Sequence, residues 1–401
     1  MSEFVVWFDS SEAGAPVLNN AAGSLIGVLD ACLVTGFNPK TLTSLTVSGG
    51  VATATLNGHG YSGTYSKDVL VAGATPALLN GRKQLTAVTA NTFTFPAPGV
   101  ADGPATGTIT TKRDSLGWVK EFTGTNKAIY KRSDVTATTM KLRVVDSAAT
   151  APSSVFNARV QMVEAATDVD TVTNARPSNT QITDGFGQHW NKGENTATAK
   201  QWTLIGDSKM FYLITQSGAV ILPGTNAQYA SFTMAFGDFV SIKPGDAYNC
   251  LLSGGTSNSS GGGTTYGQRG LGGNTGTVGT PPAIGHFIAA RPHHQLLNDA
   301  PIGTVAPFTM SSGNSTVLPY PSPIDNGFFL ATAYPVIEAV AGGMAIRGFV
   351  PGYCFLLSHF PIPHHQLLSD VPSLPGRRIL GIRSYADDIV NCAFDLTGPW
   401  R

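Results

Sequence analysis

The sequence predicts a mainly β protein made of several small antiparallel β-sandwich or barrel domains, with one short amphipathic helix near the N-terminus. Three observations predict it. Only 12% of the 401 residues are charged, and glycine is frequent, with 46 residues. Stretches rich in Thr and Ser alternate with apolar residues, which suits strands with one buried face. Gly, Pro and Asn separate these stretches and supply the backbone dihedrals of tight turns.

The one predicted helix lies near the N-terminus. Its apolar side chains recur at helical spacing and form one stripe of Leu25, Val28, Leu29, Cys32 and Leu33. Ser24 is the expected N-cap, and Gly36 is the expected C-terminal stop. Pro16 and Pro39 confine this helix to about three turns.

Residues 41–112 are predicted to form an inserted small β-module. Residues 45–56 contain two short strands around Ser48-Gly49-Gly50, which is a hairpin signal. A strand at 69–71 follows, and residues 85–95 form a second hairpin. Short strands at such even spacing are typical of a small barrel or sandwich.

The rest of the chain divides into three further segments. Residues 1–40 and 113–250 are expected to form a β-rich core domain that includes the helix, and residues 283–401 a C-terminal β domain. Residues 251–282 are a Gly/Ser-rich loop or arm, because this composition buries too little apolar surface to offset its ordering entropy. An arm would order only against a partner. The candidate assembly residues in it are Gly261, Gly262, Gly263, Tyr266 and Arg269.

The charge balance, the lengths of the apolar runs and the cysteine spacing argue against several classes of function. The 25 basic and 25 acidic residues balance, so no general attraction to nucleic acid or to an anionic membrane is expected. No run of about 18 apolar residues predicts a membrane span, and the N-terminus is not typical of a secretory signal peptide. The four cysteines form no C-x-x-C pair, so they are read as small buried hydrophobes, with one disulfide left open. They are Cys32, Cys250, Cys354 and Cys392.

One segment resembles a catalytic motif. Leu204-Ile205-Gly206-Asp207-Ser208 is similar to the first block of the GDS-type serine hydrolases, in which the serine after a strand is the nucleophile. That family also carries a Gly-x-Asn-Asp block and an Asp-x-x-His block, and this sequence contains neither. Because Gly and Asp form turns readily, we interpret the segment as a turn between two strands. No catalytic residue is predicted.

A repeated segment contains paired histidines. Residues 292–299 read Pro-His-His-Gln-Leu-Leu-Asn-Asp, and residues 363–370 read Pro-His-His-Gln-Leu-Leu-Ser-Asp. Adjacent side chains on an extended segment point to opposite faces, so neither pair can readily chelate one ion. No metal site is therefore predicted. The repeats are interpreted as two equivalent loops on related β-units.

The remaining polar and aromatic candidates are weaker. Residues 168–170 and 387–388 each contain two aspartates, which we interpret as solvated loop acids. There is no phosphate-binding glycine motif, so no cofactor is predicted. Trp190 and Trp400 are the candidates for surface contacts, for example by stacking on sugars, although single aromatic residues also occur in cores and interfaces.

Several stretches resemble proteins of tailed-bacteriophage particles. Four segments together look like a β-module that recurs in tailed-phage virion proteins. They are residues 58–61, 69–76, 80–81 and 85–95. Residues 14–19 with 23–26 resemble the openings of phage and prophage structural proteins. Such proteins are also resembled by residues 236–239 and by the ending, from residues 374–378 to residues 398–401. These patches are scattered over roughly half the chain, and none carries a catalytic residue.

The resemblance implies a structural subunit of a tailed-phage virion without fixing its place in the particle. We expect a non-enzymatic subunit that is assembled in the host cytoplasm as a symmetric homo-oligomer in the tail or baseplate. Its expected partners are copies of itself in a ring and other virion proteins. A neutral, weakly charged surface gives little protection against self-association, which is harmless in a ring. Two alternatives stay open. One is a tail-tip or fibre protein that binds a host receptor or glycan, and the other is a capsid decoration or head-fibre protein.

Overall fold

A computed structural model describes most of the N-terminal half of the chain and parts of the remainder. The described residues are 5–63, 67–147, 157–176, 189–192, 197–216, 231–254, 287–289, 330–332, 334–340, 343–356, 365–369, 371–383 and 391–401. They are mainly β, in several antiparallel sheets with a short helical segment near the N-terminus, which confirms the predicted fold class. No sheet of the described residues closes into a barrel.

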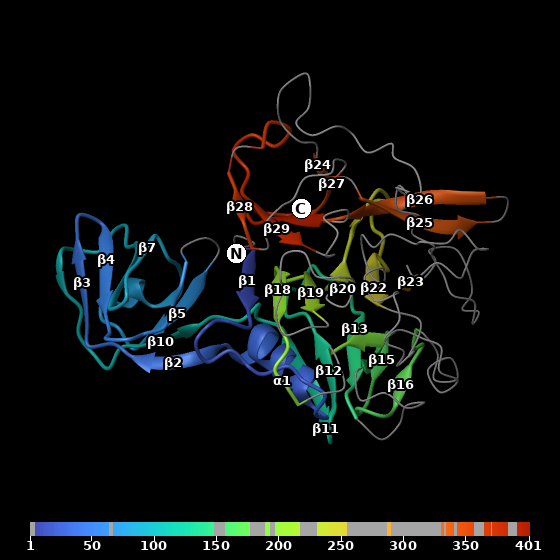
Figure 1. Ribbon diagram of the computed structural model, residues 1–401, viewed down its shortest axis with the longest axis horizontal. Helices are drawn as coiled ribbons and strands as arrows, with labels where there is room; N and C mark the ends of the chain where they lie inside the picture. Colours follow the sequence, from blue (N-terminus) through green and yellow to red (C-terminus); the bar gives the residue numbers. More distant parts are fainter. Residues whose placement is uncertain are drawn as a thin grey trace.

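A six-stranded antiparallel sheet forms the middle layer of the molecule (Figure 1). In spatial order its strands are β1 (Val6–Asp9), β18 (Trp202–Gly206), β19 (Met210–Gln216), β20 (Ser231–Asp238), β22 (Cys250–Gly254) and β23 (Phe287–Ala289). Successive side chains of a strand point to opposite faces. Leu204 and Leu213 therefore enter one core, while Ile205 and Tyr212 enter another. The sheet is thus covered on both faces.

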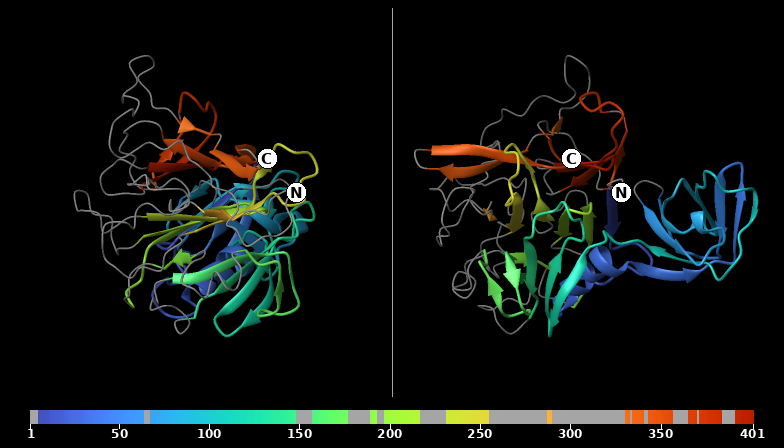
Figure 2. Two further views of the ribbon diagram at one scale, coloured as in Figure 1. Left: turned by 90° about the vertical axis from the view of Figure 1, so that its right-hand side faces the viewer. Right: turned by 180° about the vertical axis from the view of Figure 1, so that it is seen from behind.

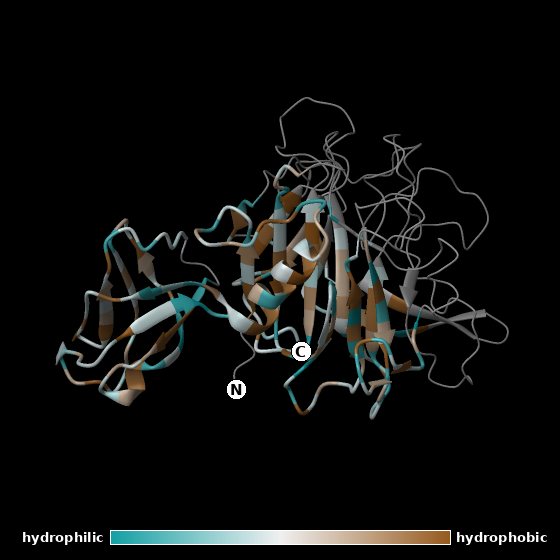
Figure 3. Cartoon of the chain, turned by 90° about the horizontal axis from the view of Figure 1, so that it is seen from below, coloured by the Kyte–Doolittle hydropathy of each residue, from teal (hydrophilic) through white to brown (hydrophobic). Residues whose placement is uncertain are grey.

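The layer below the middle sheet in Figure 1 combines the helical segment with a second sheet. The helical segment consists of α1 (Ser24–Leu29) and the π-helical η1 (Asp30–Thr35). The sheet consists of β11 (Val119–Gly124), β12 (Lys127–Lys131), β13 (Lys141–Val145), β14 (Asn157–Val163) and β17 (His189–Asn191), and the hairpin of β15 (Ala165–Ala166) and β16 (Val172–Thr173) lies beside it. Their apolar side chains share one core with the middle sheet, and Figure 3, seen from below, shows brown apolar residues interspersed with paler and teal ones in this part of the molecule.

The layer above the middle sheet comes from the C-terminal part of the chain. One sheet has the order β24 (Leu330–Ala331), β27 (Tyr353–Leu356), β30 (Asn391–Asp395), β29 (Ile379–Arg383) and β28 (Leu367–Leu368). A three-stranded sheet has the order β21 (Val240–Ser241), β26 (Gly343–Val350) and β25 (Tyr334–Val340). Tyr353, Phe394 and Trp400 pack with Tyr212 of the middle sheet in the second core.

Residues 37–113, which include the predicted segment 41–112 and are here called the module, project to one side of these three layers, here called the body (Figures 1 and 2). The module's first sheet has the order β2 (Phe37–Thr41), β10 (Thr110–Arg113), β5 (Asp68–Ala72) and β6 (Gly81–Gln84). Its second sheet has the order β7 (Ala87–Val88), β8 (Thr92–Pro96), β4 (Val51–Thr55), β3 (Ser44–Ser48) and β9 (Gly103–Pro104), and η2 (Ala77–Leu79) is a short 3-10 turn. A hydrophobic cluster drawn only from residues between Leu42 and Ile109 lies within the module.

The hairpins predicted in the module are present. Strands β3 and β4 pair through Ser48 and Val51, and both residues of the intervening turn have positive φ, 58° for Gly49 and 75° for Gly50. Glycine adopts such angles without steric cost, which explains the Gly-Gly pair. The limits of the four predicted segments stay predictions.

The helix begins and ends where the sequence predicts, but its predicted N-cap is wrong. Ser24 does not cap the helix, because its hydroxyl donates to Asn19 O at 2.7 Å. Asp146, which directly follows β13, supplies the acceptor instead. Its carboxylate accepts a hydrogen bond of 2.8 Å from the backbone N–H of Leu25. Gly36 ends the segment with φ 70°, as expected.

Strand β22 corrects the predicted loop or arm at 251–282. Leu251 and Leu252 belong to that range, yet they lie in the middle sheet and are fully buried, one in each core. Residues 255–280, with the candidate assembly residues of the arm, lie outside the described residues. Among the described segments, no helix has the length and apolar character needed to cross a membrane.

Candidate functional site

Among the described residues, the densest group of buried charges lies where the module meets the body. Asp9 ends β1, and Glu12 follows it in the next turn. Lys67 directly precedes β5, and Arg113 ends β10. We call Asp9, Glu12, Lys67 and Arg113 the junction cluster. Their side chains are 8%, 3%, 3% and 2% exposed, so four charges are removed from water at one place.

The four charges pair with one another. Lys67 Nζ donates to Asp9 Oδ2 at 3.2 Å and to Glu12 Oε1. Arg113 Nε donates to the other oxygen of Glu12 at 2.6 Å. Buried charges are tolerated only when they are paired and hydrogen-bonded. Two anions and two cations satisfy this condition, with no net charge left over.

The cluster also holds the backbone of β1. Arg113 Nη2 donates to Trp7 O at 2.9 Å, and Arg113 Nη1 donates to Asp68 O. Since β1 is an edge strand of the middle sheet, Arg113 occupies an acceptor that another strand would otherwise use. The guanidinium group also lies 5.0 Å from the ring centre of Phe8. One arginine therefore connects β10 of the module to β1 of the body.

The surroundings of Lys67 and Asp9 are asymmetric. Lys67 Nζ lies 3.5 Å from the ring centre of Trp7, which covers the amine. Asp9 Oδ1 faces away from Lys67 and accepts hydrogen bonds from Ser11 N, at 2.9 Å, and from Ser11 Oγ. Glu12 is held in place by Asp9 N, which donates to Glu12 Oε1 at 3.1 Å.

The pKa values of these groups follow from burial and charge. Burial lowers the pKa of the Lys67 amine, and Glu12 opposes that effect only in part. Burial alone would raise the pKa of Asp9, but Lys67 and the hydrogen bonds from Ser11 bring it below its usual value. Lys67 and Asp9 therefore rest as an ion pair whose amine releases its proton more readily than an exposed lysine does.

His365, in the second of the two repeats, lies beside this cluster. Its Nε2 is 2.7 Å from Thr203 Oγ1, and its ring centre is 5.3 Å from that of Trp7. Burial lowers the pKa of His365, so the neutral ring is favoured. The described residues contain no group of three or more ligands suited to a metal ion. His294 and the rest of the first repeat lie outside the described residues.

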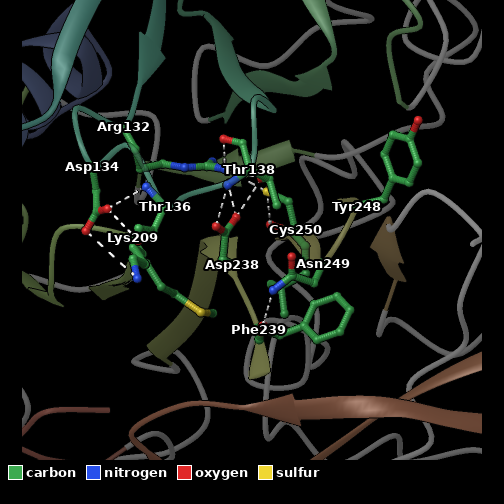
Figure 4. Close-up of polar contacts among 12 residues, drawn as sticks. Arg132, Asp134, Thr136, Thr138, Lys209, Asp238, Phe239, Tyr248, Asn249 and Cys250 are labelled. Atoms are coloured by element: carbon green, nitrogen blue, oxygen red, sulfur yellow. Dashed lines mark hydrogen bonds and ion pairs between the residues drawn. The ribbon is translucent and has the colours of Figure 1, made fainter. Parts of the chain in front are cut away.

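A second polar cluster surrounds Asp238 at the end of β20 (Figure 4). Arg132 Nη2 donates to Asp238 Oδ1 at 2.7 Å, and Thr138 N donates to Asp238 Oδ2 at 2.8 Å. Arg132 Nη1 also lies 3.5 Å from Cys250 Sγ. Burial raises the pKa of the Cys250 thiol to about 12, so this thiol is not a nucleophile at neutral pH. The cluster joins the loop after β12 to β20 and β22.

The segment that resembles a hydrolase motif is the turn between β18 and β19, as the sequence predicts. Asp207 Oδ1 accepts hydrogen bonds from the backbone N–H groups of Lys209, at 2.8 Å, and Met210, at 2.7 Å. Ser208 Oγ donates to the carboxylate of Asp134 at 3.0 Å. A serine that donates to an ionised carboxylate is held in place and is not paired with the histidine base that such a hydrolase uses.

The two tryptophans proposed as surface contacts are buried, so that prediction is wrong. Trp190 is 0% exposed, and its Nε1 donates to Ser253 O at 2.7 Å. Trp400 is 8% exposed, and its Nε1 donates to Asp395 O at 2.8 Å. Each indole places its large apolar area in a core and satisfies its single N–H on a backbone carbonyl. Neither ring is available to stack on a sugar.

The other candidates that lie among the described residues take structural positions. Asp168 and Asp170 lie in the loop between β15 and β16, where Asp168 accepts two backbone N–H bonds and Asp170 accepts from Lys127 and Arg143. Residues 387–388 and the arm candidates Gly261, Gly262, Gly263, Tyr266 and Arg269 lie outside the described residues. Cys32, Cys250 and Cys354 are buried, in line with their reading as small hydrophobes.

Comparison with known proteins adds no assignment. No protein-family model matches the sequence, and a search of curated proteins found no match. The junction cluster therefore has to be interpreted from its own geometry.

Proposed function

We propose that this chain is a non-enzymatic structural subunit of a tailed-phage virion, which assembles as a symmetric homo-oligomer in the tail or baseplate. The observation that carries the proposal is the junction cluster, whose buried ion pairs fix the projecting module to the body. A ring closes only if every subunit presents its contact surfaces at the same angle. A rigid joint between the module and the body supports such a role, because domains joined by a weak interface move relative to each other.

The edges of the described sheets give this proposal a mechanism. In the five-stranded sheet of the body, β11 is an outermost strand. The outer edge of such a strand presents backbone donors and acceptors that a neighbouring chain can pair with. Burial of apolar surface around such a contact would supply the association energy.

The alternatives differ in what they would need. A receptor- or glycan-binding head would require contact residues other than Trp190 and Trp400, since both are buried. A capsid decoration or head-fibre protein would need the same fixed angle between the module and the body as a tail subunit. Immunogold labelling of intact particles separates the tail, the tail tip and the capsid.

The test is the oligomeric state of the purified full-length chain, measured by mass photometry and negative-stain electron microscopy. We expect a closed ring with one defined copy number. Lys67→Ala loosens the joint and is expected to abolish the ring. Lys127→Ala removes only a partly exposed pair with Asp170, on the inner strand β12, and leaves the ring intact. A chain that stays monomeric at micromolar concentration contradicts the proposal.

A further inference from the structure

We propose that the side chains of Lys67 and Asp9 condense to an isopeptide bond, with Glu12 as the proton carrier, and that this covalent link ties the module to the body. The three groups already lie in contact: Lys67 Nζ donates to Asp9 Oδ2 at 3.2 Å and to Glu12 Oε1. The inference does not depend on the proposed function, because a single chain carries every group involved.

Burial favours amide formation at this site. In water an amine and a carboxylate stay apart as ions, because both are well solvated and water is in excess. Here the side chains of Lys67 and Asp9 are only 3% and 8% exposed, and the ring of Trp7 covers the amine. Fixed proximity replaces a bimolecular encounter, and exclusion of water favours the neutral products. The lowered pKa of Lys67 also makes its neutral, nucleophilic form more accessible.

The two oxygens of Asp9 are prepared for different roles. Oδ1 accepts hydrogen bonds from Ser11 N and Ser11 Oγ. These donors point at the oxygen that gains negative charge when the amine attacks the carboxyl carbon, as in an oxyanion hole. Oδ2 faces Lys67 and is the oxygen that leaves.

The reaction balances without a cofactor or an oxidant. The Glu12 carboxylate takes one proton from the Lys67 ammonium and passes it to Asp9 Oδ2, so that a neutral amine faces a neutral carboxyl group. The amine lone pair then forms a bond to Asp9 Cγ while the C=O electron pair moves onto Oδ1. Glu12 takes a second proton from the nitrogen and passes it to Oδ2, the electron pair on Oδ1 re-forms the C=O bond as the Cγ–Oδ2 bond breaks, and Oδ2 departs as water. One positive and one negative charge become a neutral amide, and Glu12 ends as it began. Arg113 acts as a positioning residue, since it holds Glu12 Oε2 at 2.6 Å and leaves Oε1 toward Lys67.

The chain contains a matched pair that lacks this arrangement. Lys192 and Asp146 are 3% and 1% exposed and lie 2.5 Å apart. Lys192 Nζ also donates to Ala21 O at 2.8 Å, and in the described part of the chain no second carboxylate bonds to this amine. Without a proton carrier, Lys192 and Asp146 are expected to remain an ion pair.

The test is intact-mass spectrometry of the full chain, followed by tryptic peptide mapping. We expect the mass to fall short of the sequence mass by one water, and a branched peptide to join the segment of Asp9 to that of Lys67. Lys67→Arg and Glu12→Gln are each expected to restore the full mass after allowance for the substitution. Peptides with Lys192 and Asp146 serve as the internal control and should be linear.

The mass of the unaltered chain decides whether the isopeptide bond forms, so the test does not depend on whether a variant folds. If the unaltered chain has its full sequence mass and linear peptides at Lys67 and Asp9, no bond forms and the proposal is overturned. If Glu12→Gln, shown by circular dichroism to be folded, still lacks one water, the role given to Glu12 is wrong. Neither result bears on ring assembly, which is read separately by mass photometry.

Discussion

The guanidinium group of Arg401 donates a hydrogen bond of 2.6 Å to Asp207 Oδ2, although 194 positions separate the two residues. Its other terminal nitrogen donates to Asp238 O at 2.7 Å. Asp207 lies in the turn between β18 and β19, and Asp238 ends β20. The segment after β30 is thereby tied to two places on the middle sheet.

Arg401→Ala is expected to lower the free energy of unfolding by about 2 kcal/mol, because it leaves the fully buried Asp207 carboxylate without its charged donor. Urea denaturation followed by circular dichroism measures the change. Arg377→Ala is the matched control, because Arg377 also pairs with an aspartate but is 45% exposed. Its expected cost is below about 1 kcal/mol. Equal costs for the two variants would contradict the role given to Arg401.

Asp68 predicts a pH dependence of stability. It is fully buried, and neither carboxylate oxygen has a hydrogen-bond partner among the described residues. Burial raises the pKa of Asp68 from 3.8 to about 6, and Arg82 and Arg113 offset this only in part. From about pH 4 to pH 6 the folded chain therefore holds a proton that the unfolded chain has released. Stability from this group is full below pH 4 and falls as the pH rises through 6, by about 3 kcal/mol at about 1.4 kcal/mol per pH unit.

Asp68→Asn removes the titrating group and keeps the size of the side chain. We expect this variant to lose the decline between pH 4 and pH 6 and to be more stable than the unaltered chain at pH 7. Urea midpoints measured at intervals of pH test both statements. A variant with the same slope as the unaltered chain would show that Asp68 does not titrate in this range.

Much of the fold could be predicted from the local pattern of polar and apolar residues, but strand β1 could not. Alternation identified the hairpins of the module because one face of each strand is buried. Polar and apolar residues do not alternate in β1 and the residue before it. Val6 and Phe8 enter one core, while Trp7 and the preceding Val5 enter the other, so every position from Val5 to Phe8 is apolar. A strand buried on both faces reads as a plain apolar run, without a period that marks it as a strand.

The junction cluster could not be predicted for a related reason. Glu12 and Arg113 are 101 positions apart, and Asp9 and Lys67 are 58 positions apart. Only the tertiary fold brings them together. The one local signal is the placement of charged residues next to apolar strand residues, as in Lys67-Asp68 before Val69. The prediction that Trp190 and Trp400 make surface contacts failed because the aromatic residue type alone does not distinguish a core position from a surface position.

Asp146 is expected to be essential for the stability of the helix and of the sheet beside it. Its carboxylate accepts from Leu25 N at the start of α1 and pairs with Lys192. Asp146→Ala leaves the N–H of Leu25 without its acceptor and the buried Lys192 ammonium without its counter-ion, with only Ala21 O still accepting from it, at an expected cost of about 4 kcal/mol. Adding Lys192→Met removes the stranded charge, so the double variant should recover part of that loss. Chemical denaturation of the two single variants and the double variant measures the coupling, and purely additive losses would contradict it.

Gly352 and Gly376 offer a test of packing around Trp400. Both have left-handed backbone angles, with φ 68° and 73°. A β-carbon at Gly352 would lie 2.1 Å from Trp400 Cε2, whereas one at Gly376 would meet nothing within 4 Å. Gly376→Ala therefore bears only the backbone strain, about 1 kcal/mol. Gly352→Ala must also displace an indole that packs on Tyr212, with a total expected cost of about 3 kcal/mol. Urea denaturation compares the two variants, and a red-shifted tryptophan emission should accompany Gly352→Ala alone. Indistinguishable stabilities and emission spectra would mean that Trp400 does not occupy this position against Gly352.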